Sequence, residues 1–292
     1  MSDKPLKFAI FLSLILTLVA FWDHQLTSYL KEFVVLIHEI CHASAALFTG
    51  GMVKGIALHG NEGGETIAIP ASFRGSFILV VSAGYIGSSL VGGLLLKSAF
   101  SGHNARQTLI LFGLMLISVS VLYSKLGELA YFTGIFWGVG ILVIGMLGES
   151  ISILTLVFLG TSISLYSLYD LSDFADKLPE TDAGILAFWM SGLTPDDLNS
   201  EEIPVAVMFL GYLIATLWSL LSIGCIYFFL KGSLRDYHLP TPDEGNGVEQ
   251  FERFPGDLSP EAKMWLEKRG VDPESGVVIP PDLLLGFPPK DN

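Results

Sequence analysis

The segment Phe33-Val-Val-Leu-Ile-His38-Glu39-Ile-Cys-His42-Ala-Ser-Ala-Ala-Leu-Phe48 determines how the rest of the chain is interpreted. It is an apolar run of helical length that carries His38, Glu39 and His42 at its centre. A charged group in the middle of a membrane helix costs about 2.5–3.5 kcal/mol on insertion scales, so such residues mark a functional site by default. The segment therefore predicts a functional site inside an apolar helix.

The composition of the whole chain is that of a membrane protein. Of 292 residues, 51% are hydrophobic and 15% are charged, whereas a soluble domain carries about 25% charged residues. The net charge is −13, and no run rich in Lys and Arg provides a footprint for phosphates. The composition excludes a disordered or nucleic-acid-binding protein. It predicts an integral, multi-pass protein that contacts the lipid bilayer, without indicating which membrane.

Seven apolar runs are long enough to be considered as membrane helices. They predict an all-α polytopic membrane protein with six or seven transmembrane helices. The number depends on two points: whether the first run is an uncleaved helix, which we favour, or a removed signal sequence, and whether residues 131–169 cross twice. The runs are Phe8–Trp22, Ser28–Phe48, Phe77–Leu96, Thr108–Tyr123, Tyr131–Leu147, Ile151–Tyr169 and Pro204–Leu230.

Three segments differ in character from the apolar runs. In residues 50–74, two β-prone pieces, Val53–His59 and Glu65–Pro70, flank the glycine-rich residues 60–64, which predicts a small β-hairpin with a five-residue loop. Residues 170–203 form an acidic connector, and residues 231–292 form a polar, proline-rich tail. We therefore expect a membrane domain over residues 1–230, which includes the hairpin and the connector, followed by the C-terminal tail.

Small residues recur every four positions in the third apolar run, at Gly84, Ser88 and Gly92. Such a ladder allows two membrane helices to approach closely. We interpret it as a packing surface.

The central segment contains the motif His-Glu-x-x-His at residues 38–42. At about 100° per residue, His42 lies about 40° from His38 around the helix, and Glu39 lies about 100° from it, so all three share a face. Two imidazoles one turn apart can bind one Zn²⁺, and the glutamate between them can act as general base. Zinc lowers the pKa of its bound water to about 7, which supplies hydroxide for attack on a carbonyl. Cys41 points to the other side of His38 and is interpreted as a small packing residue.

These residues also carry a resemblance to a known family. The segment Phe33–Gly51, followed by a short β element and by Ser82-Ala-Gly-Tyr-Ile-Gly-Ser-Ser89, resembles the site-2 protease family of intramembrane zinc metallopeptidases, most closely its small peptidase-like branch. The resemblance is concentrated in about residues 30–95. It implies a polytopic helical fold, a zinc ion buried below the membrane surface with His38 and His42 as ligands, Glu39 as general base, and cleavage of a substrate's transmembrane segment near its end.

One part of the family pattern is missing. The third zinc ligand of the family is an Asp in a later membrane helix, usually within Leu-Asp-Gly, which this chain lacks. Because catalytic zinc sites normally use three protein ligands plus water, another carboxylate must complete the site. We take Asp170, at the end of an apolar run, as the first candidate. The alternatives are Asp182, which opens a possible helix over residues 183–190, then Asp173 and Glu149.

Two functions from different classes follow from these observations. The favoured one is a zinc metalloendopeptidase that hydrolyses peptide bonds in membrane-protein substrates, with Glu39 activating a zinc-bound water. The alternative is a membrane scaffold or binding protein that descends from such a protease and no longer cleaves. A metal-ion transporter is a third option, but it would need polar residues on several spans. The sequence identifies neither the substrate nor the oligomeric state.

Overall fold

The computed structural model describes residues 4–22, 24–60, 63–73, 75–102, 104–169, 178–194 and 203–235, together with Lys263, Met264 and Lys268. The chain divides into one unit over Met1–Tyr237 and a second over His238–Asn292. Nearly all of the described residues belong to the first unit.

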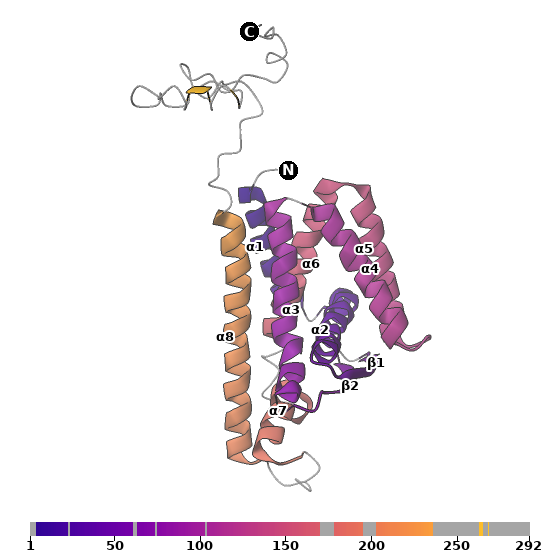
Figure 1. The fold of residues 1–292 in the computed structure, drawn as a ribbon, viewed down its shortest axis with the longest axis vertical. Helices are drawn as coiled ribbons and strands as arrows, with labels where there is room; N and C mark the ends of the chain where they lie inside the picture. Colours follow the sequence, from indigo (N-terminus) through magenta and orange to yellow (C-terminus); the bar gives the residue numbers. More distant parts are fainter. Residues whose placement is uncertain are drawn as a thin grey trace. The chain divides into compact units, whose positions relative to one another are not determined.

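The first unit is helical apart from one small sheet (Figure 1). The helices at its two ends are α1 (Lys4–Phe21) and α8 (Val205–Arg235). Between them lie α2 (Ser28–Phe48), α3 (Ser76–Ser101), α4 (Ala105–Tyr123), α5 (Leu129–Leu147), α6 (Glu149–Tyr169) and α7 (Asp182–Ser191), with short 3₁₀ turns at η1 (Gln25–Thr27) and η3 (Leu178–Glu180).

Five helices of the described chain, namely α3, α4, α5, α6 and α8, are long and apolar enough to cross a membrane. The run over residues 131–169 forms two separate helices that break at Gly148, as the double-crossing alternative required. The prediction of an all-α polytopic fold is confirmed, and the protein is an integral, multi-pass membrane protein. Of the two remaining predicted spans, α1 has a shorter apolar stretch, Leu6–Phe21. The other, α2, carries three charged side chains, at Lys31, Glu32 and Glu39.

Helix α2 is enclosed by the rest of the protein. Residues 33–43 are buried without interruption, although an amphipathic helix at a surface would alternate buried and exposed faces. The neighbours of α2 include α3, α5, α6 and both strands. Burial inside protein explains how a helix with a charged centre exists in a membrane domain, because its polar groups meet protein rather than lipid.

Glycines allow the helices to approach one another along the predicted small-residue ladder of α3. A Cβ added at Gly87 would lie 2.7 Å from Cβ of Cys41 on α2, and one added at Gly92 would lie 2.9 Å from the carbonyl oxygen of Gly160 on α6. Real Cβ contacts are not that short. Small residues at these positions therefore determine the distance between the helix backbones, as is usual in membrane helix packing.

The two strands, β1 (Met52–His59) and β2 (Gly63–Ile69), form an antiparallel hairpin directly after α2. The register pairs His59 with Gly63 and Ile56 with Thr66. The hairpin is confirmed, but its loop is shorter than the predicted five residues, because Gly63 and Gly64 are already paired with β1. Both strands contact α2.

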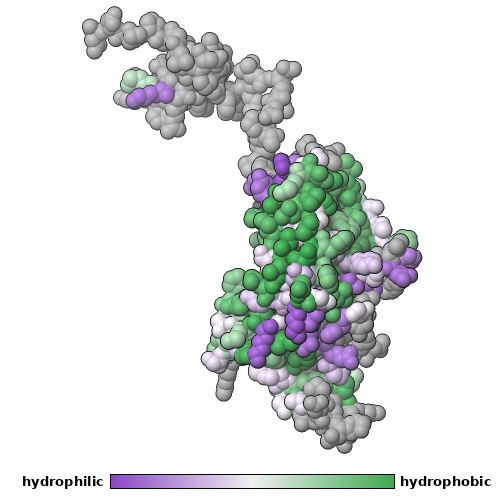
Figure 2. All heavy atoms as spheres, turned by 90° about the vertical axis from the view of Figure 1, so that its right-hand side faces the viewer, coloured by the Kyte–Doolittle hydropathy of each residue, from purple (hydrophilic) through white to green (hydrophobic). Residues whose placement is uncertain are grey.

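Hydrophobic residues cover much of the membrane unit. Figure 2 shows the face that carries α4 and α5, with a continuous hydrophobic surface and hydrophilic residues gathered below it. Helix α8 continues to Arg235, beyond the predicted end of the last span at Leu230. The predicted acidic connector contains η3 and α7, and its residues 170–177 and 195–202 lie outside the described part of the chain.

Candidate metal centre

Helix α2 presents the motif residues near its middle. His38, Glu39 and His42 are all buried, with relative exposures of 6% each. The two histidines are one helical turn apart and their rings lie close together, with centroids 4.7 Å apart. The regular helix therefore provides the arrangement that the motif predicts.

Helix α7 brings a carboxylate to these histidines. Thr181 caps the helix, since its side-chain oxygen accepts a hydrogen bond of 3.1 Å from the backbone N–H of Gly184. A threonine cap with an acidic residue in the first turn is a favourable helix start. Gly184 is needed there, because a Cβ would collide with the carbonyl oxygen of Leu178. This helix start places Asp182, the first residue of α7, beside α2.

The side chains of His38, His42 and Asp182 converge on one point. Oδ2 of Asp182 lies 2.9 Å from Nε2 of His38 and 3.1 Å from Nε2 of His42. The three ligand atoms all lie within 4.8 Å of one another. In the part of the chain that the structure describes, this is the one cluster of three or more His, Cys, Asp or Glu side chains with such geometry.

The chemistry of this donor set fits zinc. Two imidazole nitrogens and one carboxylate oxygen make up a ligand set of catalytic zinc sites, which leave a fourth position for water or substrate. In a tetrahedral site with bonds of about 2.0–2.2 Å, neighbouring ligand atoms are about 3.3 Å apart. The two nitrogen-to-oxygen distances in the structure are close to this spacing, so the carboxylate and the imidazoles fit neighbouring positions of such a site.

The orientation of His42 also suits a metal ligand. Its Nδ1 lies 2.7 Å from the backbone carbonyl oxygen of Val80 on α3. A carbonyl only accepts, so Nδ1 donates this hydrogen bond, and Nε2, which lies beside Asp182, is the nitrogen that would bind a metal ion. Such an outer partner usually fixes the tautomer of a ligating histidine. His38 has no matching bond at Nδ1 within the described residues. Its ring instead packs edge-on against Tyr85, with centroids 4.8 Å apart.

Gly84 on α3 leaves the space that the two histidine rings fill. A Cβ added there would overlap Nε2 of both His38 and His42. The first member of the small-residue ladder therefore also makes room for the two imidazole rings against α3.

We expect Gly84→Ala to lower zinc affinity by at least about tenfold, since a new methyl group would displace both imidazoles from their ligating positions. Zinc affinity would be measured by competition with a chelating dye, with thermal melting as the test of folding. Gly140→Ala on α5 is a matched control, because a Cβ there has nothing within 4 Å. Unchanged zinc affinity in the Gly84 variant would show that the histidines do not bind metal in this arrangement.

The remaining motif residue, Glu39, contacts strand β2. The Thr66 hydroxyl lies 2.7 Å from Oε2 of Glu39 and 2.9 Å from its backbone carbonyl oxygen. A Cβ added at Gly64 would lie 2.6 Å from Oε1. The hairpin is therefore packed directly on the glutamate of the motif, and a side chain at Gly64 would push that glutamate away.

The carboxylates predicted as a third ligand have different positions. Asp170, our first candidate, and Asp173 lie outside the described residues, so their placement stays a prediction. Glu149 stands at the start of α6, where its Oε1 accepts a hydrogen bond of 3.0 Å from the backbone N–H of Ala105. Asp182, the second candidate, is the carboxylate that the structure places beside the histidines. Cys41 packs against Gly87 and is not part of the cluster.

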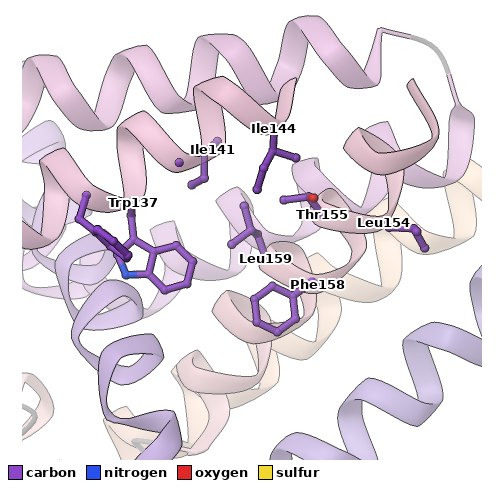
Figure 3. A pocket seen from close by; sticks show the side chains of 9 residues that line it. Trp137, Ile141, Ile144, Leu154, Thr155, Phe158 and Leu159 are labelled. Atoms are coloured by element: carbon purple, nitrogen blue, oxygen red, sulfur yellow. The ribbon is translucent and has the colours of Figure 1, made fainter. Parts of the chain in front are cut away.

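A separate cavity of about 440 Å³ opens between α5 and α6, and its lining has no ionisable side chain (Figure 3). Its one hydroxyl, from Thr155, donates to the carbonyl oxygen of Ile151 in its own helix. Trp137 and Phe158 supply much of the apolar wall. With no nucleophile, acid or metal ligand, this cavity offers no chemistry, and the metal centre remains the candidate active site.

Comparison with known proteins identifies the family of the chain. The family described as Peptidase M50B-like matches residues 11–229, which include α2, the hairpin, α7 and most of α8. Neither the curated proteins nor the solved structures contain a significant match to the chain. The family match covers the whole described membrane unit apart from its two ends and includes all three residues of the cluster. The chain therefore belongs to the Peptidase M50B-like family of membrane proteases.

Proposed function

We propose that this protein is an intramembrane zinc metalloprotease in which His38, His42 and Asp182 hold the zinc ion and Glu39 is the general base. One observation carries the proposal: ligand atoms of His38 and His42 on α2 and of Asp182 on α7 lie within 4.8 Å of one another. The buried Glu39 lies in the same turn of α2 as the two histidines. The family to which the chain belongs supports the protease class, and the donor set supports zinc.

Each residue has a defined task in this reaction. When bound, zinc supplies a Lewis acid that acidifies a nearby water and polarises the carbonyl of the peptide bond. Glu39 accepts a proton from the water while the oxygen of the water bonds to the carbonyl carbon of the peptide. Glu39 then passes that proton to the leaving nitrogen as the C–N bond breaks. The hydrogen bond from Nδ1 of His42 to Val80 keeps Nε2 of His42 available as a ligand.

The hairpin supports a membrane-protein substrate. A transmembrane helix must unwind before a protease can reach its backbone, and an unpaired strand edge can hold the extended segment by adding it to the sheet. Among the described residues, the only strand that pairs with β2 is β1, so the other edge of β2 has no strand partner there. The same strand contacts Glu39 through Gly64 and Thr66, which would hold a bound segment near the general base.

The described spans do not favour the transporter alternative. Acidic and basic residues in α3, α4, α6 and α8 stand near the helix ends, at Lys97, Arg106, Glu149, Lys231 and Arg235, while α5 has none. A metal pathway would require such groups along several helices. Among the described residues, the metal-ligating side chains that converge on one point are instead His38, His42 and Asp182.

The proposal is tested with purified full-length protein in lipid nanodiscs. We expect about one zinc ion per chain by elemental analysis, and cleavage of at least some members of a panel of labelled single-span peptides. A chelator should stop cleavage, and added zinc should restore it, because the metal supplies the Lewis acid. Zinc-loaded protein that leaves every peptide intact would instead favour the non-proteolytic scaffold.

A further inference from the structure

Among the described residues, Thr66 on β2 makes the one side-chain hydrogen bond that Glu39 receives. Its Oγ1 lies 2.7 Å from Oε2 of Glu39, and 2.9 Å from the backbone carbonyl oxygen of the same residue. A hydroxyl has one proton to donate. A carboxylate is the stronger acceptor, because hydrogen bonds to ionised groups are shorter and stronger than neutral ones, and the Oε2 contact is also the shorter of the two.

The packing of β2 on α2 restricts where the carboxylate can lie. Thr66 pairs with Ile56 across the hairpin, Gly64 pairs with Leu58, and both partners are buried. Residues two apart on a strand face the same side, so Gly64 and Thr66 both face α2. Thr66 binds Oε2, and Gly64 lies against Oε1. Strand β2 thus fixes the rotation of the Glu39 carboxylate about the bond that joins it to the side chain.

We infer that Thr66 is a positioning residue: its hydroxyl holds Oε2 of Glu39, which fixes the carboxylate and leaves Oε1 as the oxygen that accepts the proton of the attacking water. This inference rests on the proposed function. Oε1 receives no hydrogen bond from the part of the chain that the structure describes, and so it remains available to accept the proton. A general base loses efficiency when it can rotate away from its proton, because catalysis depends on a fixed reacting geometry.

The position of Thr66 also links substrate binding to the general base. Thr66 belongs to the strand whose other edge is proposed to hold the extended substrate. The residue that orients the base and the edge that holds the peptide are therefore parts of one rigid element, which keeps the scissile bond and the carboxylate in a constant relation.

The test compares Thr66→Val, which keeps the shape and removes the hydroxyl, with Thr66→Ser, which keeps the hydroxyl. Both are assayed in nanodiscs on a single-span peptide that the wild-type protein cleaves. We expect the valine variant to lose about 10- to 100-fold in kcat, as is typical when an outer partner of a catalytic residue is removed, with KM and zinc content unchanged. Serine should restore kcat to within about threefold of wild type. Lys54→Gln, at an exposed position on β1, is the control for general damage to the hairpin.

Three results would overturn the inference. They are wild-type kcat in the valine variant, a serine variant no better than valine, and loss of zinc from the valine variant, which would assign Thr66 to the metal site itself. These outcomes leave the proposed function standing, because the wild-type protein is active in the same assay. A wild-type protein that cleaves no peptide would overturn the proposed function, and this inference with it.

Discussion

Replacing Glu39 by glutamine is expected to reduce peptide-bond cleavage by about 10²- to 10⁴-fold, the usual contribution of a general base, while zinc binding is unchanged. Glutamine has the same size and its amide oxygen can still accept the hydrogen bond from Thr66, so the packing of β2 on α2 is kept. What the variant loses is the ability to accept a proton from water. Cleavage rates and zinc content would be measured on the same nanodisc preparation.

A matched control for this variant is available on the same helix. Glu32→Gln changes a partly buried glutamate of α2 that lies outside the cluster, and it should cleave at the wild-type rate. A Glu39→Gln protein that cleaved as fast as the wild type would contradict the role of this residue as general base. Loss of zinc in the same variant would indicate that Glu39 is a ligand rather than a base.

The helical part of the fold could be predicted from the sequence because apolar runs of sufficient length have few alternatives in a membrane protein. Two parts of the fold show the limits of this prediction. The chain over residues 131–169 is apolar on both sides of Gly148, so hydropathy gave two runs there but did not decide whether they cross the membrane twice. Helix α2 was predicted from the same apolar signal, but its burial depends on neighbours from distant parts of the chain.

The candidate metal centre was predictable from the sequence only where its residues lie close together along the chain. His38, Glu39 and His42 share one helix, so a periodicity of 3.6 residues was enough to place them on one face. Asp182 comes from α7, 144 residues after His38, and spacing along the chain does not determine which acidic residue of a connector turns toward a distant helix. The sequence therefore ranked Asp170 first, because it follows directly after an apolar run.

A local signal for Asp182 was nevertheless present. Thr181-Asp182-Ala183-Gly184 combines an N-cap residue, an acid in the first turn and a glycine where the chain passes closely over Leu178. Together these features fix the start of a helix, and the side chain at that start is held in one direction. Val80 had no comparable signal, and the small-residue ladder predicted Gly84 only as a packing residue, since both residues act on the histidines through tertiary packing.

The second large effect is expected for Asp182→Ala, which should lower zinc affinity by more than about 100-fold and abolish cleavage. Removal of an outer partner of a zinc ligand already costs about 10- to 100-fold in affinity, and this change removes a ligand and leaves two histidines. Zinc affinity would be measured by dye competition. The fold should persist, because Thr181 still caps α7 and a lost acid in the first turn costs only about 0.3–1 kcal/mol.

Two further variants make the assignment of the third ligand decisive. Glu180→Ala removes an exposed carboxylate two residues away and should leave zinc affinity and cleavage unchanged. Asp170→Ala tests the residue that the sequence favoured. If Asp182 is the third ligand, Asp170→Ala keeps its zinc and Asp182→Ala loses it. The reverse pattern would assign the site to Asp170, and it would require the carboxylate of Asp182 to move out of the 2.9 and 3.1 Å contacts that it makes with the two imidazoles.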